Sequence, residues 1–398
     1  MGKRGVLLMN VGTPEAPTEE AVRRYLREFL LDPDVIDLPA PLRHLLVRGI
    51  ILRTRPKRIA PAYAKIWMDE GAPLRVHSDR MVAALQERDG DLAVAHAFRY
   101  GVPSMQDGLE ALRAEGVDEL LLAPMFPQHA EATTGSAMKR AEEVLSDMAW
   151  APSLRRLEHF ETEPEYVQPL TASLQDAVDD GAHILFSYHG LPLSHVRRAD
   201  PTRAHCQKVE NCCATACSAN AMCYAHHCTM TTSAVVEALG LPEDRWSLSY
   251  QSRIGPVKWL TPASTSAVVD LAKRGVTNVA VVAPAFVVDG LESAPTARGA
   301  ALCVAKTRVA SARSTGGQPP YRPGETGFGG QFFDLLVKPH SALAGSRHHH
   351  HRPFFQKTSA AQDVLPLYFK HSNLSSFVPL PVHPAPFPSP ITPQPTRP

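Results

Sequence analysis

Short apolar runs recur along the first three quarters of the chain, and most end at glycine, proline or small polar residues. Such runs are typical of strands that are buried on both faces of a parallel sheet. Segments with apolar residues at helical spacing lie between them, and Thr18 with Glu19 and Glu20 is a typical helix start. The predicted strands are Gly5–Val11, Ala93–Phe98, Glu119–Pro124, Ile184–Phe186, Trp246–Tyr250 and Val279–Ala283, and the predicted helices are Ala21–Leu31, Ser104–Glu115, Tyr166–Val178, Thr231–Gly240 and Thr265–Arg274.

The alternation of strand and helix divides into two halves of similar layout near Glu161–Tyr166. Repeated strand–helix–strand units favour parallel sheets, so we expect an α/β fold of two Rossmann-like lobes with a cleft between them. The predicted lobes are residues 1–163 and 164–293, and the second contains a cysteine-rich insertion at 205–229. Residues 294–398 form a divergent, largely disordered tail in this prediction.

The tail prediction depends on composition. From about Thr315 the chain is rich in glycine, proline and serine, with a histidine run at His348–His351. Such a composition buries too little apolar surface to fold well. The histidine run can scavenge metal, but a solvated tail is the better interpretation.

Charge and composition exclude several classes of function. The 398 residues contain 41 Lys and Arg against 40 Asp and Glu, so no global charge attracts nucleic acid. No apolar stretch reaches the roughly eighteen residues of a membrane span, and the first apolar run is too short for a signal peptide. No strand is followed by a glycine-rich nucleotide motif. We therefore expect a cytoplasmic protein.

The segment Leu38–Leu52 is rich in leucine and isoleucine, is interrupted by proline, and precedes the basic cluster Arg53–Arg58. We favour a helix that packs on the core. The alternative is an apolar surface at 38–58 that makes peripheral contact with a membrane or holds an apolar ligand.

His189 follows the apolar run Ile184–Phe186 and precedes Gly190 and Pro192, so it lies at the carboxyl end of a predicted strand. Ligands bind at this edge of open α/β sheets. Imidazole can take up a proton or bind a metal near neutral pH. From position alone, a hydrogen bond to the backbone at the strand end is an equally good interpretation.

Six of the seven cysteines lie between Cys206 and Cys228. In a reducing compartment such a cluster indicates a metal site rather than disulfides. Four cysteines suit zinc, for which His226 or His227 can replace a thiolate. Six unrelated free thiols on one polar loop are a poor alternative.

Several motifs together resemble the ferrochelatase family, which inserts ferrous iron into a porphyrin at the end of haem synthesis. They occur in the family order over roughly residues 4–293. The matching stretches are Leu7–Pro14, Tyr25–Pro39, Phe98–Gly101, Pro127–Ser136, Phe186–Pro192, Tyr250–Leu260 and Phe286–Glu292.

The resemblance implies a chelatase-like fold and a catalytic pair, His189 and Glu292, that face each other across the porphyrin cleft and bind the substrate Fe²⁺. A porphyrin loses two pyrrole protons as the metal enters, so a base is needed beside the ring, and Fe²⁺ needs ligands while it sheds water. From the residues alone, Arg99 is equally suited to a salt bridge within its lobe, and Val11 and Trp259 to the core. The implied porphyrin contacts are Arg99, Val11, Trp259, Tyr188 and Asp289.

The cysteine segment departs from most of the family. Some bacterial ferrochelatases have an internal four-cysteine [2Fe–2S] site in this region, and the segment resembles theirs. The resemblance therefore implies a [2Fe–2S] cluster, with zinc as the alternative. The preferred ligands are Cys206, Cys213, Cys223 and Cys228, with Cys212 as the substitute for its neighbour.

The end of the chain departs as well. Gly290 stands where the family has a histidine, and Thr296 and Ala300 stand where family acids fall. We expect a ferrochelatase that acts on protoporphyrin IX. The alternatives are the same chemistry on coproporphyrin, and a non-catalytic porphyrin- or haem-binding protein.

Overall fold

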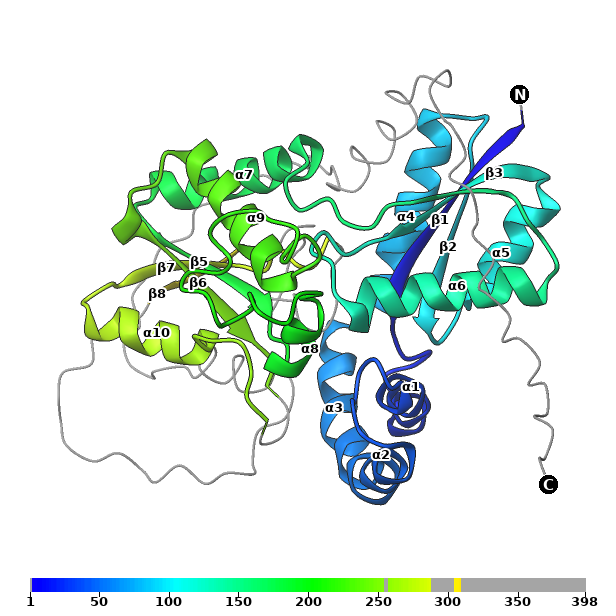
Figure 1. The fold of residues 1–398 in the computed structure, drawn as a ribbon, viewed down its shortest axis with the longest axis horizontal. Coiled ribbons are helices and arrows are strands. Elements are labelled where there is room, and N and C mark those ends of the chain that lie inside the picture. The colour runs from blue at the N-terminus through cyan, green and yellow to red at the C-terminus, as the bar shows by residue number, and fades with distance from the viewer. Residues whose placement is uncertain (1, 254–256, 288–303, 309–398) are drawn as a thin grey trace, which may run out of the picture.

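The computed structural model describes residues 2–253, 257–287 and 304–308 (Figure 1). Two sheets lie in two lobes, as predicted. In the first lobe β1 (Lys3–Gly12), β2 (Ala93–Tyr100), β3 (Val117–Pro124) and β4 (Ser153–Arg156) form a parallel sheet of order β2-β1-β3-β4. In the second, β5 (His183–His189), β6 (Trp246–Gln251), β7 (Asn278–Val282) and β8 (Val304–Arg308) form a sheet of order β6-β5-β7-β8.

The predicted fold class is confirmed, with one difference. Strands β5, β6 and β7 are parallel, whereas β8 pairs antiparallel with β7 at the sheet edge. Antiparallel edge strands are common on otherwise parallel sheets. Except for β8, the predicted tail 294–398 lies outside the described residues. The boundary between residues 163 and 164, at the start of a helix, stays a prediction.

Helices flank both sheets, and those of the first lobe include an arm that projects beside the second lobe (Figure 1). The arm consists of α1 (Glu19–Leu31), α2 (Ala40–Leu46), the π-helical turn η1 (Val47–Ile51) and α3 (Leu52–Ile66). The other helices are α4 (Pro73–Arg88), α5 (Met105–Ala114), the π-helical turn η2 (Glu131–Gly135), α6 (Ser136–Asp147), α7 (Pro164–Asp179), α8 (Leu193–Arg198), α9 (Tyr224–Leu239), the 3₁₀ turn η3 (Glu243–Arg245) and α10 (Ser264–Lys273).

The central strands explain why the sequence folds this way. Residues 6–9 of β1 and 184–186 of β5 are almost completely buried, as continuous apolar runs on central parallel strands should be. Val6 and Phe98 of the first lobe share one apolar cluster with Ile184 and Phe186 of the second. The lobes are therefore joined by a continuous core.

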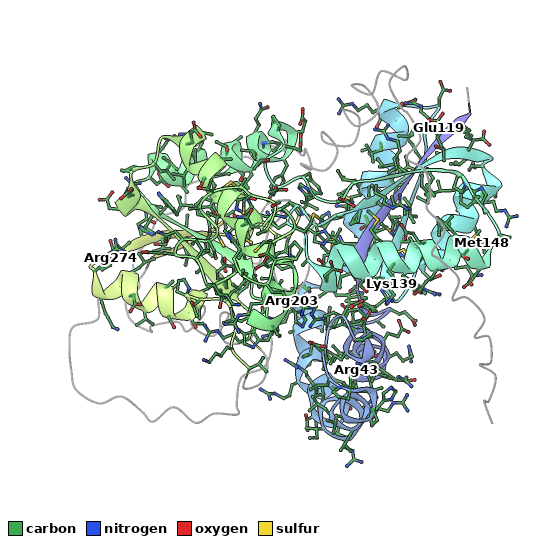
Figure 2. All side chains as sticks on the ribbon, viewed as in Figure 1. Arg43, Glu119, Lys139, Met148, Arg203 and Arg274 are labelled. Atoms are coloured by element: carbon green, nitrogen blue, oxygen red, sulfur yellow. The ribbon has the colours of Figure 1, made fainter. Side chains whose placement is uncertain are left out.

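The arm departs from the expectation that residues 38–52 pack on the core. Of these residues only Val47 and Leu52 are buried, and they pack with α1 and α3 in the apolar cluster of the arm. Within the described structure none of the α2 residues is buried, and Leu42, Leu45 and Ile50 are 55, 68 and 62 % exposed. Figure 2 places Arg43 on the same arm, away from both sheets.

No helix in the described part of the chain combines the length and the apolar character that a membrane span requires.

His183 opens β5 at the end opposite His189, and its burial makes the fold sensitive to pH. Its Nδ1 donates to the Asp244 carbonyl at 3.1 Å, and its Nε2 lies 2.8 Å from the Ser247 hydroxyl. Burial lowers the pKa of His183 below its usual value. The unfolded chain, whose histidines have a pKa of about 6.5, therefore binds more protons in mild acid.

We expect stability to rise with pH until about pH 6.5 is passed, by at most about 1.4 kcal/mol per pH unit for one proton. Thermal unfolding of the parent and of His183→Gln at about pH 5.5 and about pH 7.5 measures this. The midpoint should fall in acid for both proteins and should fall less for the variant. Equal falls would contradict the assignment.

Candidate functional site

His189 ends β5 beside β6, where its register partner is Gln251. The Gly190 N–H donates to the Gln251 carbonyl at 2.7 Å, and a Cβ at Gly190 would lie 2.7 Å from the same oxygen. Only glycine lets the chain turn this closely. The His189 carbonyl accepts from the Tyr224 hydroxyl at 2.8 Å, and the half-buried ring meets Phe286 edge-on at 6.5 Å. The strand end that carries the imidazole is therefore rigidly held.

Trp259 lies on a loop that is fastened to the turn after His189. The Leu193 N–H donates to the Lys258 carbonyl at 2.9 Å, and the Leu260 N–H donates to the Leu191 carbonyl at 3.0 Å. The ring edge of Trp259 would lie 3.5 Å from a Cβ at Gly190. The structure thus brings Trp259 and the His189 turn together, and the role of Trp259 as a porphyrin contact stays a prediction.

Arg99 is the last residue but one of β2 and is held by two partners from its own lobe. Its Nη2 donates to Asp32 Oδ2 at 2.5 Å, and its Nε donates to Ser136 Oγ at 2.7 Å. The same Asp32 oxygen accepts from the Tyr100 hydroxyl at 2.8 Å and from Ser136 at 2.9 Å. The buried carboxylate therefore joins the end of α1, the end of β2 and the start of α6. The alternative role of Arg99, a salt bridge within its lobe, is present.

Asp32 had no role in the sequence analysis, although it lies within one of the quoted motifs. Its partners are 67, 68 and 104 residues away, so no local pattern marks it.

Val11 is half-buried near the end of β1, where it packs against both the shared core and the arm. Gly12 follows with φ +108°, and a Cβ there would lie 1.8 Å from the Tyr100 carbonyl. Only glycine fits between the ends of β1 and β2. Val11 therefore lies where the sheet meets the arm.

Tyr188 does not face an opening. It is completely buried, its hydroxyl is 2.9 Å from Thr232 Oγ1, and burial raises its pKa well above the usual value. A direct porphyrin contact would require the core to open, so we leave Tyr188 out of the proposals below. Glu292 and Asp289 lie outside the described residues, and the facing of His189 and Glu292 stays a prediction.

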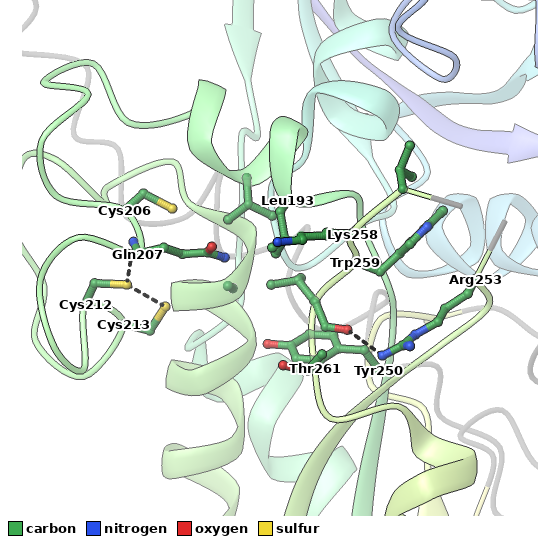
Figure 3. Close-up of a pocket in the computed structure, with 14 residues that line it drawn as sticks. Leu193, Cys206, Gln207, Cys212, Cys213, Tyr250, Arg253, Lys258, Trp259 and Thr261 are labelled. Carbon is green, nitrogen blue, oxygen red and sulfur yellow. Dashed lines mark hydrogen bonds between the residues drawn. The ribbon is translucent and has the colours of Figure 1, made fainter. Parts of the chain in front are cut away.

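A cavity of about 630 Å³ lies between the cysteine loop and the Trp259 loop. Figure 3 shows Cys206, Cys212 and Cys213 on one side and Trp259 and Arg253 on the other. The cysteine segment therefore lies directly behind a predicted wall of the porphyrin cleft.

Three thiols, those of Cys206, Cys212 and Cys213, line this cavity, and Cys223 is hydrogen-bonded to Cys213. The Sγ atoms of Cys212 and Cys213 are 3.9 Å apart. A hydrogen bond from Cys213, together with backbone N–H groups at the start of α9, lowers the pKa of Cys223 to about 6, and the same bond raises the pKa of Cys213. Burial raises the pKa of Cys206 to about 11, and the negative charges of the Cys223 and Cys212 thiolates raise it in the same direction.

Cys228 and Cys217 are placed differently. Helix α9 begins at Tyr224, so the last residues of the predicted insertion 205–229 are helical, and Cys228 is completely buried in the core. Cys217 is exposed, with Sγ 3.8 Å from His205 Nε2.

The two histidines named as alternative ligands have other partners. His226 Nδ1 lies 2.8 Å from the Cys213 carbonyl and His227 Nε2 lies 2.8 Å from the Ala221 carbonyl, so both nitrogens donate to backbone oxygens. Burial also lowers the pKa of His227 to about 4.

His159, Glu161 and His227 form a group that the sequence analysis missed, with one ligand atom of each within 4.8 Å of the others. His159 Nδ1 is 2.7 Å from the Glu161 carboxylate. However, the His129 N–H donates to His227 Nδ1 at 3.1 Å, so Nδ1 carries the lone pair and Nε2 carries the proton. A metal on Nε2 of His227 would require the ring to lose its proton and become an imidazolate. We therefore interpret the group as a set of hydrogen bonds that joins the segment between β4 and α7 to α9.

Comparisons with known proteins identify the family of the chain. The family model for ferrochelatase matches residues 3–297. The chain is 42 % identical to the ferrochelatase of Pseudomonas fluorescens (strain Pf0-1) over 295 residues, which cover 74 % of this chain and 86 % of that protein. It is also 42 % identical to the ferrochelatase of Bdellovibrio bacteriovorus over 298 residues, which cover 74 % of this chain and 87 % of that one. Sequence motifs, fold and relatives thus lead to one conclusion: the chain belongs to the ferrochelatase family.

Proposed function

We propose that the chain inserts Fe²⁺ into protoporphyrin IX and that His189 is the base at the ring. One observation supports this most strongly. The residues implied by the family motifs lie at the carboxyl ends of parallel strands in both sheets, with Val11 and Arg99 on the neighbouring strands β1 and β2 and His189 on the central strand β5. This is the edge where α/β sheets bind ligands.

The reaction needs little more than positioning and proton transfer. Two pyrrole N–H protons leave as Fe²⁺ enters, so charge is balanced and iron keeps its oxidation state. The imidazole of His189 and the carboxylate of the predicted partner Glu292 hold the substrate Fe²⁺ as it loses water. Once the iron has passed to the ring nitrogens, the freed imidazole accepts one pyrrole proton and the freed carboxylate accepts the other. Trp259 and Val11 supply apolar walls for the macrocycle.

Anaerobic assays of haem formation test the function, with protoporphyrin and coproporphyrin side by side. Turnover of protoporphyrin well above coproporphyrin supports the proposal. If coproporphyrin is turned over faster, coproporphyrin is the substrate. Porphyrin binding without haem formation would favour the non-catalytic alternative.

We also propose that Cys206, Cys212, Cys213 and Cys223 hold a [2Fe–2S] cluster. The donor set fits, since two thiolates on a tetrahedral centre with bonds of about 2.3 Å lie roughly 3.8 Å apart, close to the 3.9 Å between Cys212 and Cys213. A bound cluster supplies one-electron redox chemistry, which iron insertion does not use. Its role is therefore structural or regulatory, and the same donors would also accept zinc.

Freshly purified protein should absorb in the visible range, because sulfur-to-iron charge transfer gives such bands. We expect Cys223→Ser to lose this absorbance together with its bound iron, and Cys217→Ser to keep both. A colourless protein with stoichiometric zinc would overturn the cluster and leave zinc in its place. Equal retention of the cluster by both variants would overturn the ligand set.

A third proposal concerns the arm, which we expect to dock on an anionic membrane surface. Leu42 and Leu45 are three residues apart and share one exposed face of α2, with Ile50 exposed beyond them. Arg43 and Arg48 lie within the same stretch, and four more cationic residues follow at 53–58. An exposed apolar face with basic neighbours suits a surface of anionic lipid.

Sedimentation with vesicles tests the docking. We expect the parent to bind phosphatidylglycerol vesicles and to bind phosphatidylcholine vesicles weakly. The double variant Leu42→Ser/Leu45→Ser should lose most of this binding. Val269→Ser, at an exposed valine on α10 of the other lobe, is the matched control and should bind as the parent does. Equal binding by parent and double variant would exclude this surface.

A further inference from the structure

The cysteine loop is organised by two buried polar side chains that take no part in iron insertion. The first is Asp200, which follows α8 and is 3 % exposed. Its Oδ1 accepts from the Thr202 N–H at 2.9 Å and from the Thr202 hydroxyl at 2.6 Å. Its Oδ2 accepts from the backbone N–H groups of His205 at 2.8 Å and Cys206 at 2.9 Å. One carboxylate thus fixes the backbone at the first thiol.

The second is Asn220, which is 2 % exposed and spans the rest of the loop. Its Nδ2 donates to the carbonyls of Cys212 at 3.0 Å and Thr215 at 2.9 Å. Its Oδ1 accepts from the Cys217 N–H at 2.8 Å, and its own carbonyl accepts from the Cys223 N–H at 2.9 Å. Asn220 therefore links the backbone at Cys212 to the backbone at Cys223.

The loop backbone carries strain that these bonds hold in place. Arg203, Gln207 and Asn211 are non-glycine residues with φ of 54°, 57° and 51°. Such left-handed residues persist only where the surroundings impose them. Gln207 lies directly after Cys206, and its N–H donates to Cys212 Sγ at 3.4 Å. The strained backbone therefore lies next to Cys206 and Cys212 in the chain.

We propose that Asp200 and Asn220 are positioning residues that hold Cys206, Cys212 and Cys223 in the geometry that receives the metal centre. This inference rests on the proposed cluster. A polar loop with few apolar side chains does not fix its own shape, so metal binding would otherwise carry the full cost of ordering it. Groups that orient ligands in this way typically change metal affinity about 10–100-fold.

Asp200→Asn tests the first residue. The amide keeps the shape but offers one oxygen instead of two, so it cannot accept from both sets of backbone N–H groups. We measure the anaerobic loss of visible absorbance and protein-bound iron in the presence of a strong iron chelator. The variant should lose its cluster about 10–100-fold faster than the parent. Asp270→Asn, an exposed aspartate on α10, is the matched control and should match the parent.

Asn220→Ser tests the second residue in the same way, and it also serves if Asp200→Asn does not fold. Thermal unfolding and circular dichroism of the metal-free proteins show whether the fold is kept. If the parent binds the cluster and the folded variants release it at the parental rate, this inference is wrong while the proposed cluster stands. A parent without cluster iron overturns the proposed cofactor and this inference together.

Discussion

Replacing His189 with alanine is expected to lower Fe²⁺ insertion by at least about 10²-fold, because general-base catalysis alone contributes about 10²–10⁴-fold. The loss should exceed that of a base alone if the imidazole also holds the substrate iron. Porphyrin affinity should change little, because the apolar walls and not the imidazole bind the macrocycle. Anaerobic assays of timed samples measure haem formation, and quenching of protein or porphyrin fluorescence on mixing measures porphyrin binding.

His183→Gln is the matched control, since it changes a histidine at the opposite end of the same strand. It should alter stability and its pH dependence but leave insertion per folded molecule near the parental rate. If His189→Ala keeps turnover within about threefold of the parent, the imidazole is not the base. If it loses porphyrin binding in parallel with turnover, the side chain shapes the cleft rather than the chemistry.

The layered fold could be predicted because its central strands are buried on both faces. Such strands need unbroken apolar runs, and these stand out in the sequence between helical segments that begin at residues such as Thr18 and Ser104. The turn after His189 was also visible, since Gly190 and Pro192 interrupt the apolar strand pattern.

Other features could not be predicted because they depend on which face a residue presents. Leu42 and Leu45 lie in a segment whose leucine-rich composition suits a core helix, and only the structure shows that both side chains are exposed. For Tyr188, by contrast, the sequence is enough to predict the face. Neighbouring residues on a strand point to opposite faces, so a His189 that faces the cleft directs Tyr188 into the lobe. That argument needs only the sequence, and it favours leaving Tyr188 out of the porphyrin contacts.

Cys228 illustrates a third limit. Spacing alone groups it with the other cysteines, but it lies on helix α9, is completely buried, and is not among the residues that line the cavity with Cys206, Cys212 and Cys213. Spacing within a loop fixes distance along the chain and not direction in space.

Replacing Asp32 with asparagine is expected to destabilise the fold by about 2–4 kcal/mol, because it leaves the Arg99 guanidinium without its buried counter-charge. The single oxygen Oδ2 accepts hydrogen bonds from Arg99, Tyr100 and Ser136, and an amide nitrogen at that position would face donors. Chemical denaturation measures the loss. Asp34→Asn, two residues along the chain, is the control and should change stability by no more than about 0.5 kcal/mol.

A double-mutant cycle separates the pair from its surroundings. If Arg99 is held chiefly by Asp32, Asp32→Asn/Arg99→Gln should be more stable than the sum of the single losses predicts, with a coupling of about 1–3 kcal/mol. Additive losses would mean that Arg99 is held mainly by Ser136 or by substrate. Because Asp32 also caps the end of α1, its loss should loosen the arm, against which the proposed wall residue Val11 packs. The KM for porphyrin should therefore rise more than kcat falls, whereas a catalytic role for Asp32 would lower kcat first.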